Sequence, residues 1–239
     1  MFSRRADRQV QVHAGPSHRL AEEALGAGGS VLDVGAGGGA ASLPLASWAT
    51  WIAAVDTDEA MLGDLARRAE RLGLSVEAIL GTWPEVADHS PVADVVVCHH
   101  VFYNVSDLEP FVRALTAHAR RRVVVEITDR HPLTALNPLW MRFHGLLRPE
   151  RPTAEDAAAA LQALGFDLGV ERWEPPPEPP HHSFAEVVAL ARRRLCLPAE
   201  ADAEVAQALQ EMGVDPGNPI LAGPSGRKLV TLWWAGEAA

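Results

Sequence analysis

Cysteine, net positive charge and long apolar runs are all scarce in this sequence, and each shortage excludes a class of protein. The chain has only 2 cysteines, Cys98 and Cys196, too few for a disulfide framework or a cysteine-rich zinc site. This scarcity fits a reducing cytoplasm, which is the expected location. The formal net charge of -10 repels phosphate backbones and anionic lipid, so neither nucleic acid nor a membrane is an expected partner.

No stretch approaches the roughly 18 apolar residues that a membrane-spanning helix requires. The first ten residues, MFSRRADRQV, are charged and lack an apolar centre, so they do not resemble a signal peptide. Hydrophobic residues nevertheless make up 48% of the 239 residues, enough for one large domain with a sizeable core. We therefore expect a single domain over residues 1–239, acting as a monomer or homodimer.

Short apolar segments alternate with segments of helical periodicity along most of the chain. The alternation predicts right-handed crossovers and a doubly wound, mainly parallel α/β sheet. Apolar residues on both faces of several segments are typical of strands covered by helices on both sides. The expected strands are Ser30–Val34, Trp51–Val55, Ser75–Leu80, Ala93–Cys98, Arg122–Ile127, Phe166–Trp173 and Lys228–Trp234.

Polar residues indicate where several helices begin. Asp58 has the position of an N-cap. Ser106 with Glu109, and Ser183 with Glu186, have the spacing of a capping box, in which side chain and backbone satisfy each other's free N–H groups.

Two stretches interrupt the alternation. Residues 130–152 follow the fifth predicted strand, and residues 175–226 follow the sixth and begin in a proline-rich run that favours extended chain. We expect both to be cover segments of the same domain. His181 and His182 are adjacent rather than spaced as ligands of one metal, and no carboxylate cluster is evident, so no metal is expected.

The segment VLDVGAGGGA, residues 31–40, places four glycines directly after the first predicted strand. Glycine is costly inside regular structure, so this density indicates a tight turn or the close approach of a ligand. Residues 40–49, AASLPLASWA, can form a helix whose start offers unpaired N–H groups, provided that Pro44 lies in or near its first turn.

The glycine pattern alone fits two ligand classes. Gly35, Gly37 and Ala40 match G-x-G-x-x-A, the loop of a nicotinamide dinucleotide site. Asp33, with Gly35, Gly37 and Gly39, matches D-x-G-x-G-x-G. The second pattern, VLDVGAGGG, resembles the first motif of the class I S-adenosylmethionine-dependent methyltransferases.

Three later stretches resemble the same family. IAAVDTDEAML is similar to its second-strand motif, ADVVVCHHVFYNV to its fourth strand and following loop, and KLVTLWW to its antiparallel seventh strand. The resemblance is good over residues 28–130 and looser beyond. It implies a Rossmann-like sheet of seven strands with an antiparallel last strand, S-adenosylmethionine as cofactor, and a small-molecule acceptor.

The resemblance also implies which residues hold the cofactor. Asp33 would hold the ammonium region, directly or through water, and Asp56 would accept from both ribose hydroxyls. Thr82 would bond the adenine and Trp83 would stack on it, although the acidic residue common at this turn is missing; the alternative is that Trp83 anchors the turn. The expected contacts are Asp33, Gly35, Ala36, Gly37, Gly39, Asp56, Thr57, Met61, Gly81, Thr82, Trp83 and His99.

Methyl transfer from a sulfonium is an in-line displacement that needs alignment, exclusion of water and, for a hydroxyl, usually a base. The candidate bases are His99, His100 and His131; for the first two, the alternative is a contact with the methionine end of the cofactor. The expected substrate-binding residues are Tyr103, Asn104, Trp140, Phe143 and His144. The alternative for the aromatic residues of segment 130–152 is simple packing.

Two other functions stay open at this point. One is an NAD-linked oxidoreductase, against which Asp33 and the terminal strand argue. The other is a non-catalytic S-adenosylmethionine-binding module, which would need the same glycine loop. For a methyltransferase, the expected acceptor atom is oxygen or nitrogen rather than carbon. The chain lacks the Asn-Pro-Pro-aromatic run common in relatives that methylate amides or nucleobase amines.

Overall fold

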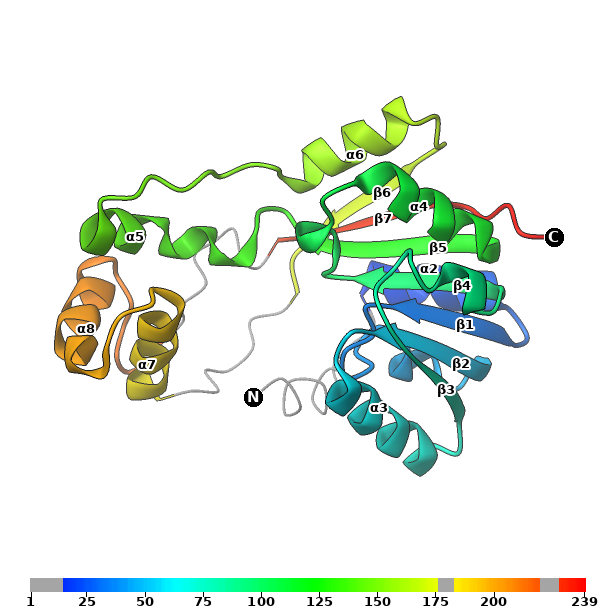
Figure 1. Cartoon of the computed structure of the whole chain (residues 1–239), viewed down its shortest axis with the longest axis horizontal. Coiled ribbons are helices and arrows are strands. Elements are labelled where there is room, and N and C mark those ends of the chain that lie inside the picture. The colour runs from blue at the N-terminus through cyan, green and yellow to red at the C-terminus, as the bar shows by residue number, and fades with distance from the viewer. Residues whose placement is uncertain (1–14, 176–182, 220–227) are drawn as a thin grey trace. The chain divides into compact units, whose positions relative to one another are not determined.

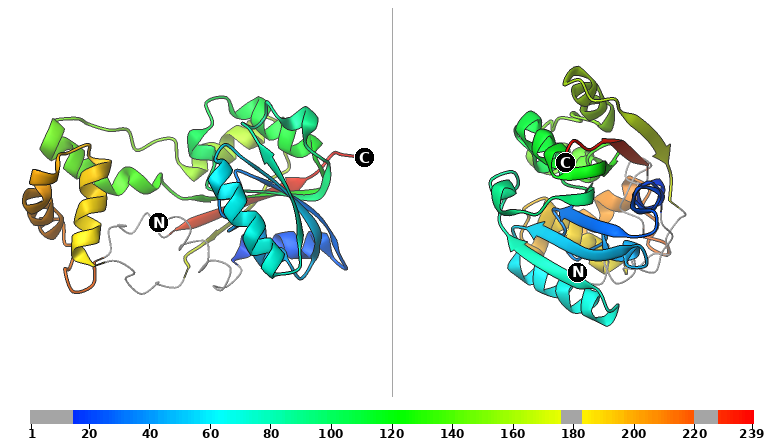
Figure 2. Two further views of the ribbon diagram at one scale, coloured as in Figure 1. Left: turned by 60° about the horizontal axis from the view of Figure 1, so that its bottom comes forward. Right: turned by 90° about the vertical axis from the view of Figure 1, so that its right-hand side faces the viewer.

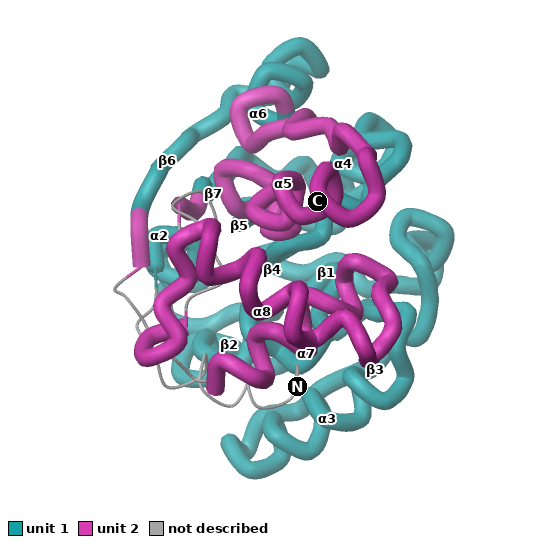
Figure 3. Tube along the Cα trace, turned by 90° about the vertical axis from the view of Figure 1, so that its left-hand side faces the viewer, with its two compact units in different colours: residues 1–127, 157–173, 230–239 teal, residues 128–156, 174–229 magenta. Residues whose placement is uncertain are grey.

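The computed structural model describes residues 15–175, 183–219 and 228–239, so His181 and His182 lie outside the described residues. The chain divides into two compact units, which Figure 3 colours separately. Unit 1 comprises residues 1–127, 157–173 and 230–239, and unit 2 comprises residues 128–156 and 174–229. Both predicted cover segments fall in unit 2. That the two units act as one domain, with these segments as its cover, stays a prediction.

Within the described residues, a seven-stranded sheet forms the centre of unit 1 (Figure 1), with the order β3-β2-β1-β4-β5-β7-β6. β1 pairs in parallel with β2 and β4, β2 with β3, and β4 with β5. The predicted doubly wound, mainly parallel sheet is therefore confirmed. The strands are β1 (Gly29–Val34), β2 (Ala49–Asp56), β3 (Ser75–Leu80), β4 (Ala93–His99), β5 (Ala119–Thr128), β6 (Gly169–Trp173) and β7 (Leu229–Ala235).

The last strand, β7, runs antiparallel to β5. The Asp129 N–H donates to the Lys228 carbonyl oxygen at 2.8 Å, and the Gly236 N–H donates to the Arg121 carbonyl oxygen at 3.1 Å. Residue numbers thus rise along one chain as they fall along the other, which defines an antiparallel pairing. The predicted antiparallel last strand is confirmed, and it lies between β5 and β6.

Helices cover both faces of this sheet. α2 (Pro16–Leu25) and α3 (Glu59–Arg71) share one apolar core with every second residue of the central strands, while α4 (Leu108–Ala117) lies over the other face (Figure 2). The intervening strand residues are buried as well, as expected for parallel strands covered on both sides. This arrangement leaves the carboxyl ends of the strands as the place where a ligand can bind.

Two predicted helix starts are confirmed. The Asp58 side chain caps α3 by accepting hydrogen bonds from two backbone N–H groups in its first turn. Ser183 and Glu186 form the predicted capping box at the start of α7 (Phe184–Arg194). The last helix of unit 1 is α6 (Ala154–Ala163), whose first residues belong to unit 2.

Two other predicted helix starts are wrong. α4 begins one residue later than a Ser106 cap would require, with Asp107 at the N-cap position, and the Glu109 carboxylate instead accepts from Arg113 on the helix surface. Of residues 40–49, the first nine form turns and a single 3-10 segment, η1 (Leu43–Leu45), rather than an α-helix, and Ala49 begins β2. Pro44 lies in the first turn of η1, where a missing N–H is tolerated, and the chain returns to the sheet at Ala49, the first residue of β2, before an α-helix develops.

Unit 2 is helical and has a core of its own. It contains η4 (Pro132–Leu136), α5 (Asn137–His144), α7, η5 (Ala199–Ala201) and α8 (Asp202–Glu211). Buried aliphatic side chains from α5, α7 and α8 form one cluster, which includes Leu139, Val187, Ala191, Leu195, Val205 and Leu209.

Candidate active site

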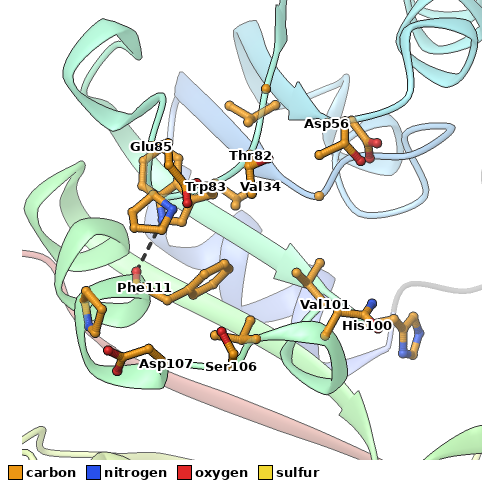
Figure 4. Close-up of a pocket in the computed structure, with 18 of the residues that line it drawn as sticks. Val34, Asp56, Thr82, Trp83, Glu85, His100, Val101, Ser106, Asp107 and Phe111 are labelled. Carbon is orange, nitrogen blue, oxygen red and sulfur yellow. Dashed lines mark hydrogen bonds between the residues drawn. The ribbon is translucent and has the colours of Figure 1, made fainter.

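A pocket of about 570 Å³ lies at the carboxyl ends of β1, β2 and β4 in unit 1 (Figure 4). Doubly wound sheets bind their ligands at this edge. The lining comes from the ends of these strands, the turn after β3, the loop before α4 and the first turn of α4. Its residues are Val34, Gly35, Val55, Asp56, Thr57, Gly81, Thr82, Trp83, Pro84, Glu85, His99, His100, Val101, Asn104, Val105, Ser106, Asp107, Pro110 and Phe111.

The glycine loop after β1 needs glycine for both its backbone angles and its space. Gly35, Gly37 and Gly39 have φ angles of 73°, 49° and 84°, in the left-handed region that other residues rarely adopt. A Cβ atom on Gly35 would lie 2.3 Å from Val101 Cγ2, and one on Gly39 would lie 2.7 Å from Leu43 Cγ. The loop therefore cannot take this path with larger residues at those two positions.

Asp56, at the end of β2, lines the pocket and holds the glycine loop in place. Its Oδ2 accepts a hydrogen bond from the Gly37 N–H at 2.7 Å, and its Oδ1 accepts one from the Asp58 N–H at 2.9 Å. An ionised carboxylate has about four acceptor positions. Two therefore stay available for hydroxyl donors of a ligand in the pocket.

Asp33 lies beneath the loop and outside the pocket lining. It is fully buried, the Ser42 hydroxyl donates to its Oδ2 at 2.5 Å, and its Oδ1 has no hydrogen-bond partner in the described structure. Burial raises the pKa of Asp33 to about 7; the bond from Ser42 opposes this rise and the charge of Asp56 adds to it. An unsatisfied buried oxygen is costly, so an ammonium group or N–H donor would be favoured here.

The turn after β3 presents Thr82, Trp83 and Glu85 to the pocket (Figure 4). Trp83 is only 6% exposed; its indole N–H donates to the Phe111 carbonyl oxygen at 3.2 Å, and its ring meets His118 edge-on at 5.0 Å. These contacts are those of a residue that anchors the turn, and stacking on adenine stays a prediction. Glu85, two residues after Trp83, supplies an acidic side chain to the lining that the sequence analysis did not predict.

His99 and His100 follow one another at the end of β4, and both line the pocket, but their rings have different neighbours. The His99 ring meets the His18 ring edge-on at 5.4 Å, and its Nε2 is buried without a hydrogen-bond partner in the described structure. Burial lowers the pKa of His99 well below its ordinary value, and His18 and His100 lower it further. The His100 Nε2, in contrast, lies 3.7 Å from Oε1 of Glu126, a buried residue of β5.

The remaining predicted residues of unit 1, apart from Asn104, lie outside the pocket lining. Ala36, Gly37, Gly39 and Met61 belong to the glycine loop or the first turn of α3. Tyr103 is also outside the lining, whereas Asn104, the next residue of η3 (Phe102–Asn104), is part of it.

The predicted substrate residues of unit 2 have structural contacts within that unit. Trp140 and Phe143 pack against its helical core, and the Arg148 guanidinium lies 5.0 Å from the centre of the Trp140 ring. His144 Nε2 is hydrogen-bonded to the Leu195 carbonyl oxygen at 2.7 Å. The packing alternative thus accounts for these positions, and a role in acceptor binding stays a prediction.

His131, the third candidate base, begins η4 in unit 2. Its Nδ1 accepts a hydrogen bond from the Leu133 N–H at 3.1 Å. Partial burial lowers the pKa of His131, and the positive charges of Arg148 and Arg194 lower it further. A catalytic role for His131 also stays a prediction.

Sequence reasoning missed Ser17, His18 and Glu126, which lie behind His99 and His100. Glu126 interrupts the buried strand segment VVVEIT, residues 123–128, and a charged residue in such a run was the signal that could have indicated it. Over the described residues, no three His, Cys, Asp or Glu side chains are grouped so that they could hold a metal ion. The described helices include none that is long and apolar enough to cross a membrane.

Residues 31–122, which include the glycine loop and β1 to β4, match the family described as "Methyltransferase domain". An uncharacterized protein of Haemophilus influenzae is 34% identical over 104 residues, which are 43% of this chain and 38% of that protein. A ubiquinone biosynthesis O-methyltransferase of Rhizobium leguminosarum is 34% identical over 82 residues, 34% of this chain and 32% of that one. The matched region thus spans about a third of the length of these curated relatives.

Among solved structures, magnesium protoporphyrin IX methyltransferase from Synechocystis, with bound SAH, has the same fold. The TM-score is 0.55 at 17% identity, over 98% of this chain and 83% of that one. The family match and the antiparallel β7 between β5 and β6 both favour a methyltransferase over the alternative of an NAD-linked oxidoreductase. Residues 31–122 thus match a methyltransferase domain within a chain that has the Rossmann-like methyltransferase fold, which supports a class I S-adenosylmethionine-dependent methyltransferase with S-adenosylmethionine as cofactor.

Proposed function

We propose that the protein transfers the methyl group of S-adenosylmethionine to an oxygen atom of a small-molecule acceptor. The observation that carries the proposal is the position of Asp56, which holds the glycine loop and lines a pocket at the carboxyl ends of the strands. The ribose hydroxyls would donate to Asp56, and the ammonium would approach Asp33. The adenine would lie toward Thr82, Trp83 and Glu85.

In this arrangement the sulfonium end of the cofactor lies toward the end of β4, where His99, His100 and Asn104 line the pocket. A hydroxyl must lose its proton as its oxygen takes the methyl group, and a histidine beside the acceptor supplies the proton acceptor. Oxygen is chosen over nitrogen because the Rhizobium relative is an O-methyltransferase. Carbon is the least favoured acceptor atom.

The net charge of -10 favours a small acceptor over nucleic acid. We further propose that the protein acts in the cytoplasm, as a monomer or homodimer. Segments 130–152 and 175–226 are proposed to cover the acceptor, because an open sheet edge would leave the activated methyl exposed to water.

Two measurements test the proposal. Calorimetry should show binding of S-adenosylmethionine and of its demethylated product, and none of NAD; the reverse result would overturn the cofactor assignment. Turnover should then be followed as release of demethylated cofactor with phenols, carboxylic acids, amines and thiols as acceptors. Methylation of a phenol or carboxylic acid supports the proposal, and methylation of amines alone contradicts the oxygen assignment. Binding without turnover on any acceptor favours the non-catalytic module.

A further inference from the structure

A buried polar chain runs behind the pocket wall from α2 through β5 to the end of β4. The Ser17 hydroxyl donates a hydrogen bond to Glu126 Oε2 at 2.6 Å. The other carboxylate oxygen, Oε1, lies 3.7 Å from His100 Nε2. Glu126 is only 6% exposed, whereas the His100 side chain is 33% exposed and lines the pocket. This series of polar contacts thus links the buried Glu126 carboxylate to the His100 ring, which a ligand in the pocket can reach.

The same glutamate also fixes the backbone of His100. The His100 N–H donates to the Glu126 carbonyl oxygen at 2.7 Å. His100 has a φ of 60°, in the left-handed region that is uncommon for residues other than glycine. Such conformations persist only where the surroundings determine them, and they cluster at functional sites. Main-chain and side-chain contacts to one residue therefore set where the His100 ring lies.

Burying the Glu126 carboxylate costs free energy, because a charged group loses its hydration, and this cost calls for a functional explanation. Burial raises the pKa of Glu126, and the contacts of its carboxylate with the side chains of Ser17 and Trp173 act in the opposite direction by favouring the ionised form. A carboxylate behind an imidazole stabilises the imidazolium and orients the ring. His99 has the opposite environment, because its ring faces His18 and burial disfavours its charged form.

We propose that His100 is the general base of methyl transfer, that Glu126 is its positioning residue, and that Ser17 holds Glu126 in place. This inference rests on the proposed function. A lone pair of the acceptor oxygen forms the bond to the methyl carbon as the carbon–sulfur bond breaks and its electron pair returns to sulfur. The hydroxyl proton passes to the His100 imidazole and from there to water. The ionised Glu126 stabilises the imidazolium while it exists.

A purely structural role for Glu126 is the competing explanation, and it makes a different prediction about titration. If the carboxylate acts on the ring, its neutral replacement must change where His100 protonates. If Glu126 only supports the loop, the His100 titration stays unchanged. The other groups near this pair are His18 on α2, His99 on β4 and Trp173 on β6. None of them is substituted in the variants used.

The test is an NMR titration of the histidine rings in the full chain saturated with the demethylated cofactor, S-adenosylhomocysteine. His100→Gln identifies the His100 signal. Glu126→Gln keeps the size of the side chain and should lower the His100 midpoint by about 1 pH unit, because an adjacent opposite charge shifts a pKa by about that much or more. Ser17→Ala should lower it by less. Glu23→Gln, an exposed glutamate on α2, is the matched control and should leave it unchanged.

An unchanged midpoint in Glu126→Gln, with cofactor affinity intact, overturns the assignment. If Glu126→Gln does not fold, Ser17→Ala decides the question, because it leaves the carboxylate in place. Failure of the proposed function has a different signature: the unmodified protein would then either not bind S-adenosylhomocysteine or show no turnover on any acceptor of the panel.

A second readout uses the best phenol acceptor from the panel. Glu126→Gln should lower kcat at least about tenfold, leave KM unchanged, and move the acid limb of the pH–rate profile to lower pH. His100→Gln should lower kcat by about 100-fold or more, within the usual range for a general base. Equal kcat values in the parent protein, Glu126→Gln and His100→Gln would contradict the assignment of His100 as the general base.

Discussion

The Asp56 carboxylate and the Gly37 N–H are joined by a hydrogen bond of 2.7 Å, which ties the end of β2 to the glycine loop after β1. The side chain proposed to bind the ribose therefore also shapes the loop beside it. Changes at Asp56 should affect cofactor affinity and stability together, and the two effects can be separated by comparison with its neighbour Asp58.

Asp56→Ala should weaken binding of S-adenosylhomocysteine by roughly 1–3 kcal/mol, the usual contribution of hydrogen bonds to a charged group. Asp58→Ala is the matched control. It removes the N-cap of α3 and should cost about 1 kcal/mol of folding free energy with little change in affinity. Calorimetry and chemical denaturation of both variants check this. Equal affinities in Asp56→Ala and the parent protein would show that Asp56 only supports the loop.

Gly35→Ala should destabilise the protein strongly, because the new Cβ would lie 2.3 Å from Val101 Cγ2 on a backbone with positive φ. We expect about 1 kcal/mol for the left-handed backbone and a further 1–3 kcal/mol for the overlap. Gly73→Ala has a similar φ of 70° but nothing within 4 Å of the new atom, so it should show the backbone cost alone. Similar denaturation midpoints for the two variants would contradict this account.

Features that are encoded by neighbouring residues were predictable from the sequence, whereas contacts between residues far apart in the sequence were not. The strands and the glycine loop were predictable because buried parallel strands are continuously apolar and left-handed turns require glycine. The predicted helix at residues 40–49 failed for a reason that was not visible locally, because the chain re-enters the sheet at Ala49 after a single 3-10 segment. Glu126 was not predicted as part of the site, because its partners Ser17 and His100 are far away in sequence and meet only in the folded sheet.

The stability of the protein should depend on pH through Asp33. Its pKa is raised from 3.8 to about 7 by burial, so its contribution to stability is fully present below about pH 4 and is lost as the pH rises through 7. Asp33→Asn cannot ionise and should therefore gain stability relative to the parent protein between pH 4 and 7. The gain should be on the order of 4 kcal/mol at most, from 1.36 kcal/mol per pKa unit. Denaturation of both proteins across this range measures it, and a constant difference would contradict it.

Cofactor affinity should also depend on the ionisation of Asp33, but it should rise with pH where the stability falls. The ammonium of the cofactor prefers the ionised Asp33, so affinity should rise with pH up to about 7 and then level off. The slope should approach but not exceed tenfold per pH unit, and calorimetry in buffers of different ionisation enthalpy should detect proton release on binding. Ser42→Ala removes the bond that favours ionisation and should move the plateau to higher pH. A flat affinity profile for the parent protein would place the ammonium elsewhere.

Trp140 and Phe143 pack against the core of unit 2, so their proposed role in acceptor binding must be separated from their effect on stability. Trp140→Ala and Phe143→Ala should lose turnover while cofactor affinity stays intact, because they remove the proposed acceptor wall and leave the glycine loop unchanged. Leu139→Ala is the control: this side chain is fully buried in the same core and its loss should cost about 2–5 kcal/mol of stability. At a temperature where all three variants stay folded, Leu139→Ala should retain turnover. If the loss of turnover instead follows the loss of stability across the three variants, segment 130–152 is scaffold, and the acceptor must be held by the loop after β4.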